Sequence, residues 1–418
     1  MAITSLFGYG GTTKALALHV KNPVFFDDKV SKPFTDENGY KVKPSSEFDP
    51  RYSSLEITSP GIPPYNELIV KAQNLISEYD FFADVMPFSV WISGTNGKTT
   101  TTQMAQHLLK DHGSVEGGNI GVPLGKLDQK APIWVLETSS FTLHYTNKAK
   151  PNLYVLLPLS PDHLSWHGDM QGYIDDKLKP VKMMQDKEIA IIPKAYEQEL
   201  TSSKSLTCKA HIIYYEDEND LAARFDIDLT KIKFKGVFLL DALLALCIKK
   251  ILFNKTDYAG INAFVIDPHR QEELYDAKGR LWVNDTKATN LDATIGALKR
   301  YKEQPIHLIL GGDDKGVDLT QLFEFMKSLH PQGTSHVEHS VNISIYAIGS
   351  NEQKLVQLSQ DFGLTCKGCQ LLENAVREID KNLQKDEVAL LSPAAASLDQ
   401  FTSYAHRGEL FKQLIHAL

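Results

Sequence analysis

The sequence predicts an α/β protein with three domains and mostly parallel sheets. Short apolar runs of strand length alternate with helical segments along the 418 residues, and this alternation is typical of parallel sheets covered by helices. A glycine-rich turn of the kind that holds phosphate lies between one such run and a helix. A hydrophobic content of 42% supports folded cores over two or three domains.

The expected strands are short apolar runs that are followed by turn residues. In chain order they read ITSLFG, VFFDD, SVWISG, IWVLET, LYVLLPLS, IAIIP, IIYYE, HLILGG, SIYAIG and VALLSP. Their grouping predicts an N-terminal domain over residues 1–87, a central domain over 88–262 and a C-terminal domain over 263–418. Each block has an ordinary domain size.

Composition disfavours several classes of function. The formal net charge is −8, and no basic stripe with interleaved aromatic residues indicates a nucleic-acid surface. Nowhere do eighteen apolar residues run together, and MAITSLFGYGG has no basic export signal, so we expect a cytosolic protein. Cys366 and Cys369 form a lone CxxC without a second pair or matching histidines, which disfavours zinc and predicts reduced thiols.

The stretch VWISGTNGKTTTT predicts a phosphate-binding loop. Gly94 and Gly97 permit close approach of the backbone to an anion, the helix amides face it, and Lys98 adds a positive charge. Thr99 or Thr100 offers a hydroxyl to magnesium. Ile92 stands where the strict pattern has a glycine, but the anion-binding features remain. We therefore disfavour a glycine-rich turn without a ligand. The nucleotide contacts are expected from Gly94, Thr95, Asn96, Gly97, Lys98, Thr99 and Thr100.

Two further strand ends carry polar residues. Glu137 ends the IWVLE run and is a magnesium-ligand candidate. Asp162, His163 and His167 follow the LYVLLPLS run, at the same expected edge of the sheet. From spacing alone, His163 is as consistent with a capping or surface residue as with a ligand, and His167 is a weaker candidate.

Taken together, these motifs resemble the Mur ligases, the ATP-dependent amide-forming enzymes of bacterial cell-wall synthesis. The resemblance covers nearly the whole chain. Three C-terminal motifs are similar to those of the members that add D-glutamate: VNDTKATN, LGGDDKG and LLSPAAASLDQF followed by RGELF. The resemblance implies a Rossmann-like N-terminal domain that binds UDP, a central P-loop-type ATPase domain and a Rossmann-like C-terminal domain for the amino acid.

The implied reaction joins D-glutamate to UDP-N-acetylmuramoyl-L-alanine, with ATP and two Mg²⁺ ions, through an acyl phosphate. The products are ADP, phosphate and a cytoplasmic peptidoglycan precursor, and the resemblance favours a monomer. A folylpolyglutamate synthase-like ligase is the nearest rival, although some ninety residues with a UDP-type glycine turn precede the phosphate loop here. A nucleotide switch without ligase activity is the rival from another class.

In the central block, the resemblance implies that Lys98 and Thr99 bind the phosphates and magnesium. Glu137 and His163 then complete the metal ligands, together with Lys177 as a carbamylated lysine. Taken alone, Lys177 in DDKLKP reads as one more solvated lysine. In the family, a helix with the sequence HN-x-x-N contacts adenine. The corresponding helix of this chain lacks that motif and has Val237, Phe238 and Asp241 instead.

The outer blocks supply the remaining candidates that the resemblance implies. Gly8-x-Gly10 is half of a dinucleotide fingerprint, and the third glycine is replaced by Thr13. The UDP-substrate contacts implied are Thr12, Asp27, Asp28, Gly61, Asn119 and Ser139. The nucleotide contacts implied in the third block are Arg270 and Asp285, and the D-glutamate contacts are Lys287, Thr289, Lys315, Ser397 and the backbone near Tyr404. A helix-end role for Lys287 and Lys315 is the structural alternative.

Overall fold

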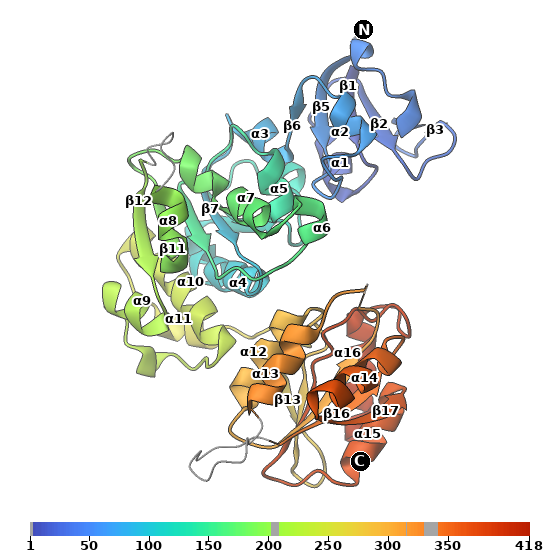
Figure 1. The fold of residues 1–418 in the computed structure, drawn as a ribbon. Helices are drawn as coiled ribbons and strands as arrows, with labels where there is room; N and C mark the ends of the chain where they lie inside the picture. The colour runs from blue at the N-terminus through green and yellow to red at the C-terminus, as the bar shows by residue number, and fades with distance from the viewer. Residues whose placement is uncertain (1–2, 202–208, 315, 330–341) are drawn as a thin grey trace. The chain divides into compact units, whose positions relative to one another are not determined.

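The structure is a computed structural model that describes residues 3–201, 209–314, 316–329 and 342–418. The chain divides into two compact units, Met1–Phe264 and Val265–Leu418. The first unit runs from blue to yellow in Figure 1 and contains two sheets, and the second runs from orange to red and contains one. The predicted boundary near residue 87, inside the first unit, stays a prediction.

The first sheet belongs to the N-terminal part of the first unit. Its strand order is β3-β4-β2-β1-β5-β6, and all its pairs are parallel except β3 with β4. The strands are β1 (Ile3–Phe7), β2 (Pro23–Asp27), β3 (Phe34–Thr35), β4 (Lys41–Pro44), β5 (Ser53–Thr58) and β6 (Leu75–Ile76), and the helices are α1 (Gly11–Leu16), α2 (Glu67–Lys71) and α3 (Glu78–Phe82).

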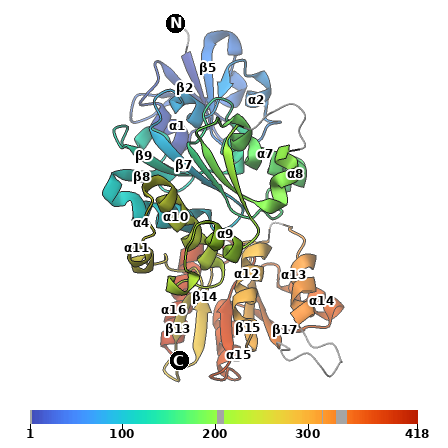
Figure 2. The same cartoon turned by 90° about the vertical axis from the view of Figure 1, so that its left-hand side faces the viewer.

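The second sheet is entirely parallel and has the order β12-β11-β10-β7-β9-β8. Its strands, of which Figure 2 labels β7, β8 and β9, are β7 (Phe88–Ser93), β8 (Ser114–Gly118), β9 (Ile133–Glu137), β10 (Leu153–Leu156), β11 (Ile189–Pro193) and β12 (His211–Tyr215). The helices are α4 (Lys98–Leu109), α5 (Ser140–Tyr145), α6 (Leu164–His167), α7 (Met170–Met183), α8 (Glu197–Thr201), α9 (Glu218–Arg224), α10 (Val237–Phe253) and α11 (Tyr258–Ala263).

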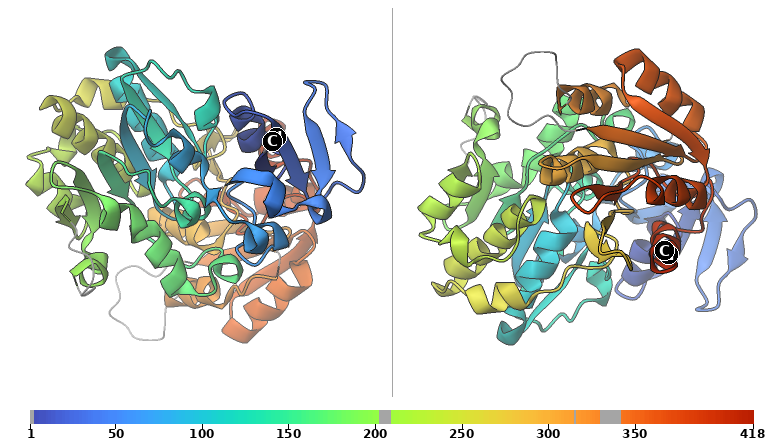
Figure 3. Two further views of the ribbon diagram at one scale, coloured as in Figure 1. Left: turned by 90° about the horizontal axis from the view of Figure 1, so that it is seen from above. Right: turned by 90° about the horizontal axis from the view of Figure 1, so that it is seen from below.

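The third sheet lies in the second unit and has the strand order β13-β14-β18-β15-β16-β17. Figure 3 shows the ribbon from above and from below, with this unit in orange and red. Only β13 with β14 is antiparallel. The strands are β13 (Glu272–Tyr275), β14 (Leu281–Asn284), β15 (Ile306–Gly311), β16 (Ile343–Ile348), β17 (Thr365–Gln370) and β18 (Val388–Leu391), and the helices are α12 (Leu291–Tyr301), α13 (Thr320–Leu329), α14 (Glu352–Phe362), α15 (Leu372–Asp380) and α16 (Tyr404–His416).

Alternation along the strands divides the core of the second unit into two layers. Leu308 and Leu310 pack with α12, α13 and α14 on one face of the sheet. Ile309 points to the opposite face and packs with α15 and α16, because successive side chains of a strand point to opposite faces. A central strand buried on both faces must therefore be apolar throughout, as HLILGG nearly is.

All ten predicted runs form strands, and the predicted α/β class with mostly parallel sheets is confirmed. Sequence reasoning overlooked β3, β4, β5, β6, β8, β13, β14 and β17. Among the described residues, Cys247, Cys366 and Cys369 are free cysteines. No helix in the described part of the chain has both the length and the apolar content needed to cross a membrane.

Candidate functional site

The phosphate loop follows β7 at the carboxyl edge of the second sheet. Gly94 has φ +146° and Gly97 has φ +82°, so both residues need the backbone freedom of glycine. Gly97 directly precedes α4, whose first residue is Lys98. The Lys98 Nζ donates to the Thr95 carbonyl at 2.7 Å, which folds the side chain back over the loop. A helix start with this turn presents backbone N–H groups and a positive charge to an anion.

A side chain at Gly97 would require two neighbouring side chains to shift. An added Cβ would lie 2.4 Å from Asp241 Oδ1 and 2.6 Å from Leu157 Cδ2. Asp241 lies on α10 and also accepts a hydrogen bond from Thr101 Oγ1 at 2.9 Å. Asp241, one of the residues that depart from the adenine motif, therefore packs beneath the phosphate loop. Phe238 is also buried, whereas Val237 is 42% exposed.

Gly97→Ala is expected to weaken nucleotide binding at least about 10-fold, because left-handed backbone alone costs about 1–2 kcal/mol at a non-glycine residue and the new methyl group would contact Asp241. A fluorescent ATP analogue measures the dissociation constant. Gly39→Ala is the matched control, since Gly39 has φ +81° with no atom within 4 Å of an added Cβ. Equal affinity in wild type and Gly97→Ala would contradict the tight fit.

A buried carboxylate joins the loop to the next strand. Glu137 ends β9 and is 3% exposed. Its Oε2 accepts from Thr99 Oγ1 at 2.8 Å and its Oε1 accepts from Asn119 Nδ2 at 2.7 Å. Thr99 and Glu137, both predicted as metal ligands, therefore lie within hydrogen-bond distance of each other, and Asn119, predicted to contact substrate, lies beside them. Thr100 is buried, with its hydroxyl shielded from solvent.

Lys177 lies on α7, and its amine reaches the other side of the same loop. The side chain is 1% exposed, and Nζ donates to the Gly94 carbonyl at 2.8 Å and to Ser93 Oγ at 3.1 Å. Burial, and next the charge of Lys98, hold the pKa of Lys177 well below its usual value. The solvated reading of this lysine is therefore wrong.

His163 precedes α6 and has φ +53°. Its ring is half exposed, with Nε2 3.5 Å from Asp162 Oδ2 and its centroid 4.7 Å from the Phe141 ring. Burial, partly offset by Asp162, lowers the pKa of His163, which favours the neutral imidazole that binds metals. Ser139, predicted to contact substrate, caps α5 by accepting from the Thr142 amide at 3.1 Å.

The N-terminal candidates lie at the carboxyl ends of β1, β2 and β5. Asp27 Oδ2 accepts from the Tyr9 amide at 2.7 Å, and Asp28 Oδ2 accepts from Asn66 Nδ2 at 2.7 Å. Thr12 lies on α1, and Gly61 is exposed in the loop after β5. Sequence reasoning did not select Tyr9. The Lys14 Nζ lies 3.8 Å from the centroid of the Tyr9 ring, and the Tyr9 hydroxyl donates to Asp36 Oδ2 at 3.0 Å.

In the second unit, several candidates gather around the loop after β14. The Lys287 Nζ lies 5.4 Å from the centroid of the Tyr404 ring, and the Tyr404 carbonyl accepts from Thr286 Oγ1 at 3.2 Å. Thr289 is exposed and Ser397 is 3% exposed. Arg270 has a buried Nε without a hydrogen-bond partner. Lys315 lies outside the described residues.

Arg407, which sequence reasoning did not select, connects three segments of the second unit: the loop after β14, the loop after β18 and the end of β15. Its fully buried guanidinium donates to the Thr286 carbonyl at 3.0 Å, to the Ala395 carbonyl at 3.2 Å and to the Gly311 carbonyl at 3.5 Å. Burial lowers the pKa of Arg407 to about 10. The RGELF motif contains this residue and was the available signal.

Asp285, predicted to contact the nucleotide, is deeply buried. It is 6% exposed, and its two oxygens accept from Ser392 Oγ at 2.9 Å and from the Gln271 amide at 3.2 Å. Burial raises the pKa of Asp285 to about 7. This carboxyl group therefore changes from its protonated to its ionised form near neutral pH.

The raised pKa predicts that stability falls as pH rises. The unfolded chain has an aspartate pKa near about 3.9, so the folded chain holds this proton more tightly. The stabilisation is complete below about pH 4 and is lost as pH rises through 7. Relative to Asp285→Asn, the wild type should lose roughly 2 kcal/mol of stability between pH 5 and pH 8.

Denaturant unfolding of both proteins at the two pH values measures this difference. The exposed Asp386→Asn is the control and should track the wild type. Parallel pH profiles for wild type and Asp285→Asn would contradict the inference.

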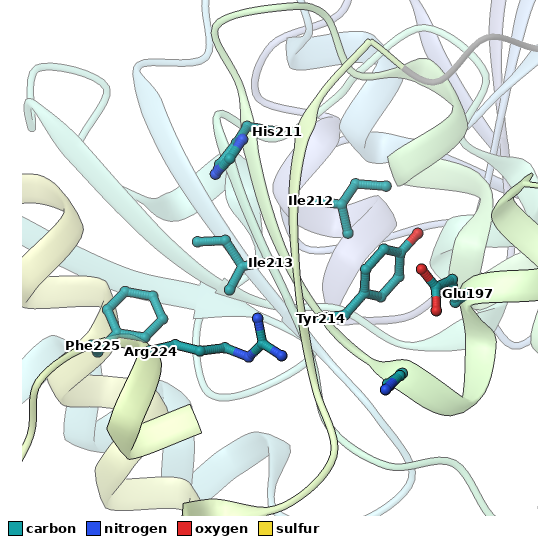
Figure 4. Close-up of a pocket in the computed structure, with 8 residues that line it drawn as sticks. Glu197, His211, Ile212, Ile213, Tyr214, Arg224 and Phe225 are labelled. Atoms are coloured by element: carbon teal, nitrogen blue, oxygen red, sulfur yellow. The ribbon is translucent and has the colours of Figure 1, made fainter. Parts of the chain in front are cut away.

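A separate pocket of about 550 Å³ lies at the edge strand β12. Figure 4 shows Ile213 with Arg224 and Phe225 on one side of this strand, and Tyr214 with Glu197 on the other. It contains none of the predicted site residues, and its lining is Lys194, Glu197, His211, Ile212, Ile213, Tyr214, Arg224 and Phe225.

Comparison with solved structures shows the fold. A MurF ligase from Acinetobacter baumannii aligns with a TM-score of 0.59 at 14% identity, over 98% of this chain and 93% of that one. A MurF ligase from Thermotoga maritima aligns with a TM-score of 0.56 at 15% identity, over 94% of each chain. At these identities the likeness concerns the fold alone.

Sequence comparison is more specific. Residues 92–242 match the Mur ligase middle domain. The chain is 52% identical to a UDP-N-acetylmuramoylalanine--D-glutamate ligase of Campylobacter jejuni over 99% of both proteins, and 45% identical to one of Helicobacter pylori over 98% of this chain and 99% of that protein. The chain therefore belongs to the UDP-N-acetylmuramoylalanine--D-glutamate ligase family of the Mur ligases.

Proposed function

We propose that this chain is an ATP-dependent ligase that joins D-glutamate to UDP-N-acetylmuramoyl-L-alanine in peptidoglycan precursor synthesis. The observation that carries the proposal is the arrangement at one sheet edge, where the phosphate loop meets a buried carboxylate, Glu137, and a buried amine, Lys177. Family membership supports the same reaction. The substrate carboxylate would attack the γ-phosphorus of ATP and displace ADP, which gives an acyl phosphate. The D-glutamate amine would then attack the acyl carbonyl, displace phosphate and lose a proton, which forms the amide.

Charge stabilisation is the main task of the central residues. Both reactants of the first step are anions, so Lys98 and the backbone amides at the start of α4 offset their repulsion. Positioning matters equally, because phosphoryl transfer gains most of its acceleration from alignment and electrostatics.

The oxygen donors at this edge fit magnesium. Mg²⁺ prefers carboxylate and hydroxyl oxygen, and Glu137 and Thr99 offer both within one hydrogen bond of each other. We propose two magnesium ions, with Thr99, Glu137, His163 and a carbamylated Lys177 as protein ligands. When bound, the metals supply additional positive charge against the phosphates.

The outer residues are proposed to hold the two ends of the substrates. Asp27, Asp28, Thr12 and Gly61 would contact the UDP part. Lys287, Thr289, Ser397 and the backbone of Tyr404 would hold D-glutamate, whose two carboxylates need cations and hydroxyl donors. Arg407 keeps the loops of this second group in register, and Lys315 is proposed on the family resemblance alone.

Phosphate release tests the function. The full chain is assayed with ATP and magnesium, with or without UDP-N-acetylmuramoyl-L-alanine, and with D-glutamate, L-glutamate or no amino acid. We expect release only when the UDP-substrate and D-glutamate are both present. Release with a folate and L-glutamate would support the folylpolyglutamate rival, and release indifferent to both additions would support a nucleotide-hydrolysing switch.

We also propose that the enzyme acts as a cytoplasmic monomer. ATP and UDP-linked precursors are cytoplasmic, and each proposed group of ligands comes from this one chain. Sedimentation velocity at micromolar concentration tests the oligomeric state, and a species of about twice 46.8 kDa would contradict a monomer.

A further inference from the structure

Three side chains with metal-binding chemistry meet beside the phosphate loop but outside the proposed magnesium ligands. His144 comes from α5, His167 from α6 and Asp176 from α7. The Nδ1 atoms of His144 and His167 lie 2.9 Å and 2.8 Å from Asp176 Oδ2. One ligand atom from each residue lies within 4.8 Å of the others. Three helices therefore direct two imidazoles and one carboxylate to a common point.

The chemistry of these donors differs from that of the proposed magnesium site. Imidazole nitrogen is a preferred ligand of Zn²⁺ and of other late first-row metals, whereas Mg²⁺ prefers oxygen. The proposed magnesium ligands include one imidazole, that of His163, beside three oxygen donors, whereas this cluster has two imidazoles and one carboxylate. Two histidines and one carboxylate form a recurrent protein ligand set that leaves further positions open to water. The set therefore fits a transition metal ion rather than a third magnesium.

Contacts outside the cluster orient the His167 ring. Its Nε2 lies 2.9 Å from Ser140 Oγ, and the Phe141 ring stacks on it with the planes 2° apart. A metal-binding histidine commonly has its second ring nitrogen hydrogen-bonded in this way, which fixes the ring and its tautomer. The Trp166 ring lies 5.0 Å from His144 and 4.5 Å from His167. The cluster thus has an aromatic wall and a fixed inner ligand.

Burial leaves one side of the cluster open. The His167 side chain is fully buried, that of Asp176 is 15% exposed and that of His144 is 35% exposed. An ion could therefore enter past His144, and water could complete its coordination. Without a metal, the imidazole N–H groups would donate to Asp176, so a bound ion would replace two protons at this point.

We propose that His144, His167 and Asp176 form a binding site for a divalent transition metal, with Zn²⁺ as the best-fitting ion. The site is distinct from the proposed magnesium ligands, since it shares no residue with them. Its occupancy would tie α5, α6 and α7 together next to Ser139 and Lys177.

Titration of the metal-free chain with Co²⁺ and Zn²⁺ tests the site. The full chain is used without a polyhistidine tag, after dialysis against a chelator, and without nucleotide or substrate. We expect one Co²⁺ per chain with a visible absorption band, and displacement of that ion by Zn²⁺. His144→Gln and Asp176→Asn should each weaken binding at least about 10-fold, because each removes one of three protein ligands.

Two control variants locate the ion. His163→Gln removes a proposed magnesium ligand, and His211→Gln removes an exposed histidine on β12; both should bind Co²⁺ like the wild type. Zinc-edge X-ray absorption should give a coordination shell of nitrogen and oxygen. Circular dichroism checks that every variant is folded, and the conservative Asp176→Asn keeps the size of the side chain.

The proposal would be overturned by a lack of binding, by unchanged binding in both His144→Gln and Asp176→Asn, or by loss of binding in His163→Gln. A shell that contains sulfur would also overturn it, since it would assign the ion to cysteines. The measurement needs no ligase activity, so its failure and that of the proposed reaction are distinguishable.

Discussion

Lys98→Ala is expected to reduce D-glutamate-dependent phosphate release by about 100- to 1,000-fold, because loss of one preorganised charge-stabilising group typically costs this much. Lys98 is the first residue of α4, and its amine is held over the loop by the Thr95 carbonyl at 2.7 Å. No other side chain at the helix start carries a positive charge in the sequence GTNGKTT. The measurement is phosphate release at saturating D-glutamate and UDP-substrate.

Lys110→Ala is the matched control, since Lys110 is an exposed lysine directly after the same helix. It should retain wild-type activity. The thermal unfolding temperature of Lys98→Ala should stay close to that of the wild type, because the amine is not part of a hydrophobic core. If Lys98→Ala kept activity within about 10-fold of the wild type, Lys98 would not be a main source of transition-state stabilisation.

Lys177→Met is expected to lower turnover by at least about 100-fold, because it removes one of the four proposed protein ligands of the magnesium ions. The buried amine has a pKa well below its usual value, chiefly through burial. A larger fraction of the neutral amine is therefore present, and the neutral amine is the form that adds carbon dioxide. Phosphate release measures turnover, and ¹³C NMR with labelled bicarbonate measures the carbamate directly.

Two variants separate carbamylation from simple charge. Lys177→Arg keeps a cation but cannot form a carbamate, since guanidinium does not lose its proton, and it should be as inactive as Lys177→Met. Lys182→Met, on the same helix and paired with Asp175, should remain active. Wild-type activity without any carbamate signal would contradict the carbamylated ligand, and an active Lys177→Arg would indicate that charge alone suffices.

The phosphate loop was predictable because its chemistry is local. A strand, two glycines at fixed spacing, a lysine and a helix follow one another within GTNGKTT, so backbone rules alone place an anion there. Strands that are almost wholly apolar, such as β15, were equally predictable, because burial on both faces favours an apolar run.

Strands that contain buried polar residues were missed, because the hydrogen-bond partners of those residues lie elsewhere in the chain. β5 reads SSLEIT, yet Glu56 is fully buried and its Oε2 accepts from the Asn74 amide at 2.6 Å. The partner that makes this burial tolerable comes from a later segment, which a local pattern does not contain.

Lys177 shows where sequence and structure divide most clearly. Tyr173, Lys177 and Val181 recur every four residues and form one buried stripe of α7, a spacing that the sequence already contains. Composition still favoured a solvated lysine, because charged side chains are rarely fully buried.

The sequence by itself determined the α/β class, the phosphate loop and the family motifs, since each depends on residues close together in the chain. The tertiary structure alone decided that Lys177 reaches Gly94, that Arg407 connects three segments of the second unit, and that His144 and His167 face Asp176. These contacts join separate helices, strands and loops, and only the packing of those elements brings their side chains within hydrogen-bond distance.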